Sequence, residues 1–185
     1  MIDKEKIKKA TILLIEGLGY DINDQNFNDT PQRVADMYEE ILEGNKFEEK
    51  EVVKFVQHSN LVIISDIEAY GFCPHHVLPI CYNVSIAYLP NKEVVGISKP
   101  IRVVYDCISK LSLQEEATET IADKIRQITG SDDVMVIVTG EHFCMRMRGV
   151  KSRGYVTVSA IRGRFHEDYT LRYETLSLIG LKMEK

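Results

Sequence analysis

The 185-residue sequence predicts an α+β fold, with helices covering one face of a mostly antiparallel sheet. Two observations predict it: strand patterns come in pairs, and two helical patterns separate the pairs. The first pair covers residues 61–67 and 84–88, and the second covers residues 134–139 and 155–161. Strands grouped in this way favour an α+β sheet over alternating βαβ units.

The individual elements follow from the spacing of apolar residues. Val84, Ile86 and Tyr88 alternate with less apolar neighbours, which is the period of a strand. The two central helices carry apolar residues at helical spacing: Ile101, Val104, Ile108 and Leu111 in the first, and Ile121, Ala122, Ile125 and Ile128 in the second. Gly130 is expected to close the second helix, and residues 170–179 are also predicted to be helical.

The first third of the chain is predicted to be helical. A first helix should bury one face and end near Gly17; that face carries Ile7, Ala10, Leu14 and Leu18. A second helix should begin at Thr30, a capping residue, with Pro31 in its first position, and end at Gly44. We therefore expect an N-terminal helical region at residues 1–50 and the main domain at residues 51–185.

Composition excludes several classes of protein. The net charge of −5 argues against a nucleic-acid-binding surface, because such a surface needs a basic face. The apolar runs are too short to span a bilayer, and the charged N-terminal segment does not resemble a secretory signal. We expect a cytoplasmic protein without nucleic-acid or membrane partners, whose four cysteines are thiols or metal ligands rather than disulfides.

Two short segments combine the residue types that bind zinc: Cys73-Pro74-His75-His76 and His142-Phe143-Cys144. Cys73 and His76 can reach one ion from a turn, and Cys144 supplies a third ligand. Three protein ligands leave a coordination position for water, which a catalytic zinc acidifies. His75 and His142 would then be available for proton transfer.

Other interpretations of these segments stay open. His142 and Cys144 lie two apart on a predicted strand, so both side chains should point the same way. His142 is therefore either a fourth ligand of a closed structural zinc site or a general acid. In a metal-free protein, Cys144 would be a packed core thiol.

Two groups of bases are candidate anion sites in this acidic chain. Arg146, Arg148, Lys151 and Arg153 follow Cys144, and Ser98, Lys99 and Arg102 lie at a predicted helix start. Either group alone is also typical of a solvated surface. Gln114 and Glu115 open another helix, where Glu115 matches a capping box with Ser112; a Gln-Glu pair can instead read a purine edge.

Together these segments resemble the GTP cyclohydrolase I family. They are, in chain order, residues 29–35 (DTPQRVA), 73–76 (CPHH), 86–90 (IAYLP), 96–99 (GISK), Gln114-Glu115 with Thr118 and Ile121-Ala122, and residues 142–150 (HFCMRMRGV). Several motifs in one order over most of the chain make the resemblance specific. This sequence departs from the family pattern at four positions: Pro74, Tyr82, Ser109 and Ser112.

The resemblance implies a function and roles. Zn²⁺ would be held by Cys73, His76 and Cys144, and His75 and His142 would transfer protons. Gln114 and Glu115 would anchor guanine, and the triphosphate would be held by Ser98, Lys99, Arg102 and Arg148. The implied reaction converts GTP and water to 7,8-dihydroneopterin triphosphate and formate, the first step of pterin and folate biosynthesis.

The resemblance also implies an architecture. This is the tunnelling fold, a four-stranded antiparallel sheet with two helices on one face, plus N-terminal helices, assembled into a homodecamer of two stacked pentamers. Two alternatives remain from the sequence: a related zinc cyclohydrolase that gives another product, favoured by Pro74, and a non-catalytic ring protein that binds a pterin or nucleotide.

Overall fold

The computed structural model describes residues 2–43, 46–48, 52–57 and 59–180 of the chain. The chain divides into two compact units, Met1–Asn45 and Lys46–Lys185, and each is described by itself. The helix end expected at Gly44 and the domain boundary expected between residues 50 and 51 lie outside the described residues.

The N-terminal unit is a pair of helices, α1 (Lys4–Gly17) and α2 (Thr30–Glu43), that pack against each other. The predicted apolar face of α1 is wrong, because Leu14 and Leu18 are exposed whereas Thr11 and Ile15 are buried. The side of α1 that carries Thr11 and Ile15 is the buried one, and on α1 the ammonium of Lys4 lies 2.6 Å from a carboxylate oxygen of Asp36 on α2.

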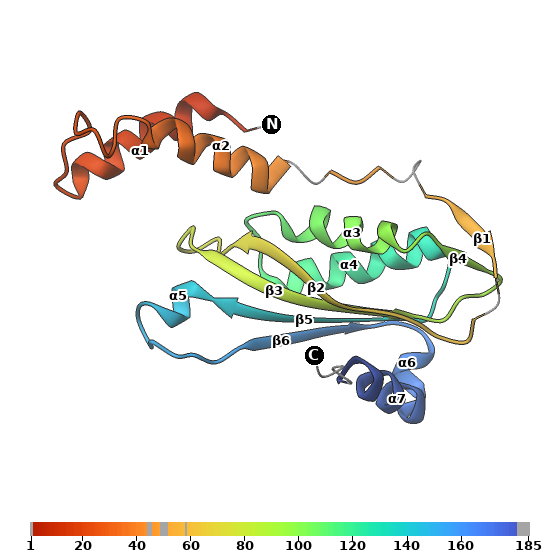
Figure 1. Ribbon diagram of the computed structural model, residues 1–185. Helices are drawn as coiled ribbons and strands as arrows, with labels where there is room; N and C mark the ends of the chain where they lie inside the picture. The colour runs from red at the N-terminus through yellow and green to blue at the C-terminus, as the bar shows by residue number, and fades with distance from the viewer. Residues whose placement is uncertain (1, 44–45, 49–51, 58, 181–185) are drawn as a thin grey trace, which may run out of the picture. The chain divides into compact units, whose positions relative to one another are not determined.

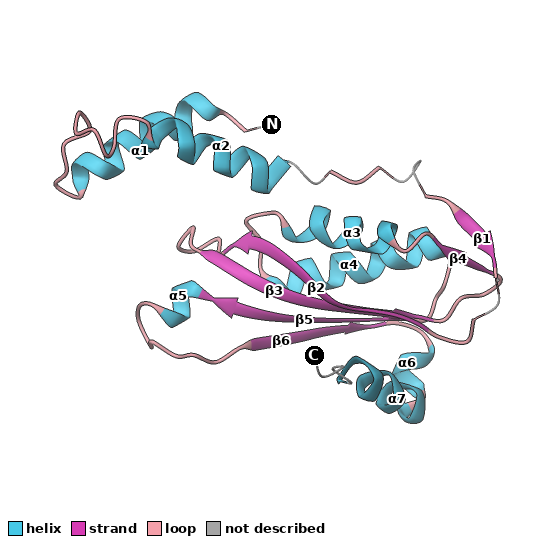
Figure 2. Ribbon diagram, viewed as in Figure 1, coloured by secondary structure: helices cyan, strands magenta, loops and turns pink. Residues whose placement is uncertain are grey.

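The larger unit is built on a four-stranded antiparallel sheet in the order β2-β3-β5-β6 (Figures 1 and 2). Its strands are β2 (Val62–Phe72), β3 (Pro79–Tyr88), β5 (Val134–His142) and β6 (Val156–Ile161). Two three-residue strands that the sequence patterns did not predict, β1 (Lys54–Val56) and β4 (Glu93–Val95), pair antiparallel in a second sheet. The predicted α+β class with antiparallel sheets is confirmed.

Helices α3 (Ser98–Ile108) and α4 (Gln114–Thr129) lie side by side over one face of the four-stranded sheet (Figure 1). The main core fills the space between these helices and the sheet, and it includes Val84, Ile86, Val104, Ile121 and Val136. Gly130 closes α4 with φ at 69°, the left-handed conformation expected of a terminal glycine.

The opposite face of the sheet is covered at one end by α6 (Arg164–Glu167) and α7 (Tyr169–Gly180), the second of which matches the predicted C-terminal helix. Phe165 is fully buried there against Ala87, Leu89 and Met135 in a smaller core. Among the described helices, none is long and apolar enough to cross a membrane.

Candidate metal centre and substrate site

The first metal-site segment is the turn that joins β2 to β3. The Cys73 amide donates to the carbonyl of Leu78 at 2.9 Å, and the Val77 amide donates back to the carbonyl of Cys73 at 2.8 Å. Val77 adopts a φ of 53°, which tightens the turn. The turn buries Cys73 and leaves His75 and His76 exposed at the end of the sheet.

The second segment follows the end of β5. His142 is the last residue of that strand, and the chain then enters the one-turn helix α5 (Phe143–Arg146), which contains Cys144. The expectation that His142 and Cys144 point the same way on one strand is wrong, because the Met147 amide bonds to the Phe143 carbonyl at 3.0 Å and ends the strand geometry. The two side chains take separate partners.

The two segments bring three potential ligands together. One ligand atom each from Cys73, His76 and Cys144 lies within 4.8 Å of the others, and the Cys73 sulfur is 3.6 Å from Nδ1 of His76. Zinc bonds of about 2.0–2.3 Å space tetrahedral ligands by about 3.3–3.8 Å, so the group fits an ion with small side-chain adjustments. In the described part of the chain this group has no fourth member.

The pKa of the Cys144 thiol lies above its ordinary value in the metal-free protein. Burial raises its pKa, and the neighbouring Cys73 sulfur raises it further. A bound divalent cation would instead lower the pKa of the thiol, since a thiol that coordinates a metal ion is deprotonated. The site is therefore expected to release protons when it takes up metal.

His75 and Arg148 lie beside the three potential ligands. The His75 Nδ1 atom is 3.9 Å from the Cys73 sulfur. Arg148 donates from Nη1 to Nε2 of His76 at 2.6 Å. Arg146, the first base of the same cluster, instead forms an ion pair with Glu141 of β5. The structure thus brings Arg148 to the metal group, whereas Arg146 is turned toward the sheet.

Gln114 and His142 form a second pair close to this end of the sheet. Gln114 is only 3% exposed, and its Oε1 lies 2.8 Å from Nε2 of His142. Its side-chain NH₂ group donates to the carbonyls of Val138 at 2.9 Å and Val156 at 3.0 Å. Burial lowers the pKa of His142, and the carboxylate of Glu115 opposes that shift.

The predicted capping box at the start of α4 is wrong. The N-cap residue is Leu113, one residue after Ser112, and its side chain makes no capping hydrogen bond. Glu115 is exposed in the first turn of the helix. Its carboxylate is therefore open to solvent at the start of α4.

Ser98, Lys99 and Arg102 lie at the beginning of α3, as expected for a helix start that attracts an anion. Ser98 and Arg102 are exposed and Lys99 is half-buried. The bases of this group and of the segment after Cys144 come from separate elements of the fold.

Two residues near His142 were not singled out as functional by the sequence patterns. The ring of Tyr82 is buried and meets the His142 ring edge-on at a centroid distance of 6.3 Å. A side chain on Gly140 would place its Cβ 2.7 Å from Oε1 of Gln114 and 3.1 Å from Nε2 of His142. A glycine inside a strand pattern is the available signal, since it often marks such a close approach.

An α+β protein with a Cys-His-Cys group near a half-buried histidine has the residue types of a metal-dependent hydrolase. The family model for GTP cyclohydrolase I matches residues 7–180. The chain therefore belongs to the GTP cyclohydrolase I family.

Curated relatives agree with the family assignment. A protein of Hyperthermus butylicus named GTP cyclohydrolase 1 is 44% identical over 178 residues, covering 96% of this chain and 92% of the relative. A protein of the same name from Clostridium perfringens is 45% identical and covers 98% of this chain and 100% of its own length. Another from Aquifex aeolicus is 42% identical, covering 96% and 97% of the two chains.

Proposed function

We propose that this protein converts GTP and water to 7,8-dihydroneopterin triphosphate and formate. The observation that carries the proposal is the convergence of Cys73, His76 and Cys144 in a chain that matches the family over residues 7–180. Opening the imidazole ring of the purine requires an activated water, proton donors for the departing nitrogens, and cationic groups that bind the triphosphate. We assign these requirements to the residues described above.

Zinc is the metal that this donor set favours, since two thiolates and one imidazole are soft and borderline ligands. Cys73, His76 and Cys144 would hold the zinc ion, which when bound would supply Lewis acidity that lowers the pKa of a water molecule. His142 and the nearby His75 exchange protons with the opening ring. Gln114 orients His142 through the 2.8 Å hydrogen bond between them.

The substrate contacts follow from the charges of the remaining residues. Glu115, exposed at the start of α4, accepts hydrogen bonds from the guanine ring. Arg148 contacts the triphosphate close to the metal group, and Ser98, Lys99 and Arg102 contact it from the beginning of α3. The expected anchoring of guanine by Gln114 does not fit its hydrogen bonds, because its NH₂ group already serves two carbonyls.

The proposal extends to assembly and cellular role. The four-stranded sheet with α3 and α4 on one face supports a tunnelling fold, in which sheets of neighbouring subunits join into rings. We propose a cytoplasmic homodecamer of two stacked pentamers with sites between subunits. It acts at the first step of tetrahydrofolate biosynthesis, within one-carbon metabolism, as an allosteric enzyme.

The test is direct. Purified protein loaded with zinc is incubated with GTP, formate is measured, and the product is oxidised to a fluorescent pterin and weighed by mass spectrometry. Formate and a pterin of the mass of neopterin triphosphate support the proposal. Bound GTP without formate, in protein shown to contain zinc, overturns it.

A further inference from the structure

The hydrogen bonds of Gln114 assign its side chain a fixed orientation. Two backbone carbonyls, of Val138 on β5 and Val156 on β6, lie 2.9 and 3.0 Å from its nitrogen. A carbonyl oxygen only accepts, so the nitrogen of the amide must face them. Both amide hydrogens are then used, and Oε1 is left pointing at His142.

This orientation decides which nitrogen of His142 carries a proton. Oε1 of Gln114 accepts and cannot donate, and it lies 2.8 Å from Nε2 of His142. Nε2 must therefore donate to it. In the neutral ring the lone pair is then on Nδ1, so Nδ1 is the atom available to exchange a proton with a substrate.

The surroundings hold this arrangement in place. Gln114 is 3% exposed and lies across the β5 and β6 backbones, and Tyr82 packs its ring edge against His142. Gly140 supplies the space, because an added Cβ would fall 2.7 Å from Oε1 of Gln114 and 3.0 Å from the Tyr82 ring. The neighbouring residues Gln114 and Glu115 have opposite exposure, since Gln114 is buried and Glu115 is exposed.

We infer that Gln114 is a positioning residue that acts through His142, fixing its Nε2–H tautomer and presenting Nδ1 to the reaction, and that it does not bind guanine. The inference rests on the proposed function, since it divides the Gln114-Glu115 pair into two roles in that reaction. Glu115 alone of the pair reads the purine.

A double-mutant cycle in the zinc-loaded, full-length protein tests this division. The variants are Gln114→Met, His142→Ala and the double variant, and Glu116→Gln in the same turn of α4 is the matched control. Turnover of GTP is measured for each. The GTP dissociation constant is measured by calorimetry in the His142→Ala background, where slow turnover permits an equilibrium measurement.

We expect Gln114→Met to lower kcat by roughly 10- to 100-fold with KM changed less than about twofold, as a lost general-acid–base alignment predicts. The double variant should be no slower than His142→Ala within about twofold, because a residue that acts through another loses its effect when that other is gone. GTP affinity should be equal in the single His142→Ala and double variants.

The inference is overturned if the losses of kcat from the two substitutions multiply in the double variant, or if the double variant binds GTP more weakly than His142→Ala. Either result leaves the proposed function intact. Absence of formate from the wild-type protein overturns both. If Gln114→Met does not fold, Gly140→Ala replaces it. Its Cβ separates Gln114 from His142 without removing either side chain, and the same loss of kcat at constant KM is expected.

Discussion

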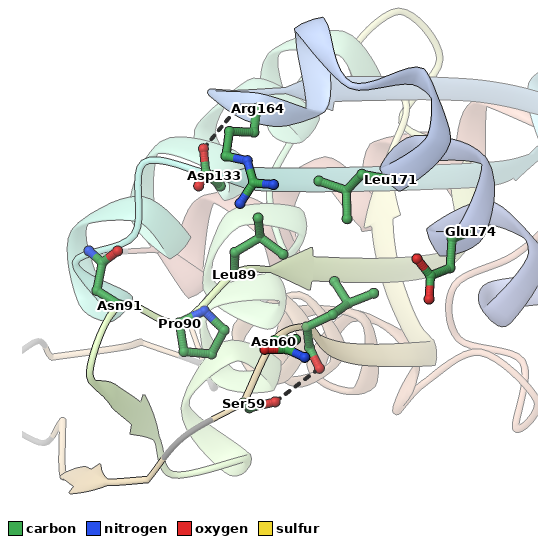
Figure 3. Close-up of a pocket in the computed structure, with 10 residues that line it drawn as sticks. Ser59, Asn60, Leu89, Pro90, Asn91, Asp133, Arg164, Leu171 and Glu174 are labelled. Carbon is green, nitrogen blue, oxygen red and sulfur yellow. Dashed lines mark hydrogen bonds between the residues drawn. The ribbon is translucent and has the colours of Figure 1, made fainter.

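The two ends of the four-stranded sheet differ in a way that locates the site. At one end the β2–β3 turn and α5 gather sulfur and imidazole ligand atoms within 4.8 Å. At the other end a cavity of about 440 Å³ opens between the sheet and α6 and α7, as Figure 3 shows; among the residues that line it are Asn60, Leu89, Asp133, Arg164, Leu171 and Glu174.

Several polar groups that line this cavity make hydrogen bonds within the fold. A side-chain oxygen of Asp133 accepts from the Arg164 amide at 2.7 Å, which joins α6 to the start of β5 (Figure 3). Asn91 donates to the carbonyl of Gly130 at 2.9 Å, and Ser59 donates to that of Leu61 at 3.2 Å. The comparison teaches that metal-ligand chemistry, rather than the presence of a hollow, distinguishes the candidate functional end of the sheet.

The largest expected effect comes from removing a metal ligand. Cys73→Ala should abolish stoichiometric zinc binding and lower turnover by at least ~10³-fold, since a catalytic metal contributes several kcal/mol to transition-state stabilisation. Zinc content by elemental analysis and formate release are the two measurements. Cys81→Ala, on β3 and outside the metal group, is the control and should keep its zinc. Equal zinc content in both variants would contradict the assignment.

At the opposite end the largest effect should be on stability. Phe165→Ala removes a fully buried ring and should lower the free energy of unfolding by about 3–5 kcal/mol. Denaturant unfolding measures the loss, and the variant should still bind one zinc per chain at low temperature. Tyr169→Ala, at a ring that is 76% exposed, is the matched control with a change below about 0.5 kcal/mol. Similar losses in both variants would show that α6 does not anchor this core.

A smaller effect should follow from neutralising the exposed carboxylate of α4. Glu115→Gln should raise KM for GTP by roughly 10- to 100-fold, because a charge-assisted hydrogen bond is worth about 1.5–3 kcal/mol. Steady-state kinetics of formate release give the value. An unchanged KM would mean that guanine is held elsewhere, and the division between Glu115 and Gln114 would fail with it.

The smallest effect should come from the cavity. Arg164→Ala removes the guanidinium that Figure 3 shows among its lining residues, and we expect kcat and KM for GTP to stay within about twofold of wild type. The backbone amide that bonds Asp133 is retained in this variant. A loss above tenfold at unchanged stability would move part of the substrate site to this end.

Much of the fold could be predicted because its strands and helices carry regular apolar periods. The strand predicted over residues 134–139 continues to His142, and the helix predicted before Gly130 ends at Thr129. The three-residue strands β1 and β4 could not be predicted, since three residues are too short to show a period. The buried face of α1 was predicted wrongly because leucines at helical spacing do not by themselves show which side packs, and the buried side carries Thr11 and Ile15.

Part of the candidate site could likewise be predicted from the sequence, and part could not. The grouping of Cys73, His76 and Cys144 could be predicted, because cysteine and histidine are the ligands zinc prefers and two of the three share one turn. The orientation of Gln114 could not, because its partners are backbone carbonyls 24 and 42 residues away in the chain. The residues next to Gln114 in the sequence do not indicate hydrogen bonds to such distant carbonyls.

X-ray absorption at the zinc edge of the reconstituted protein tests the central claim most directly. The account predicts two sulfur ligands at about 2.3 Å, one imidazole nitrogen at about 2.0–2.1 Å, and one further light atom from solvent that exchanges when GTP is added. A shell of four protein ligands, or one with fewer than two sulfurs, would contradict an open site formed by Cys73, His76 and Cys144.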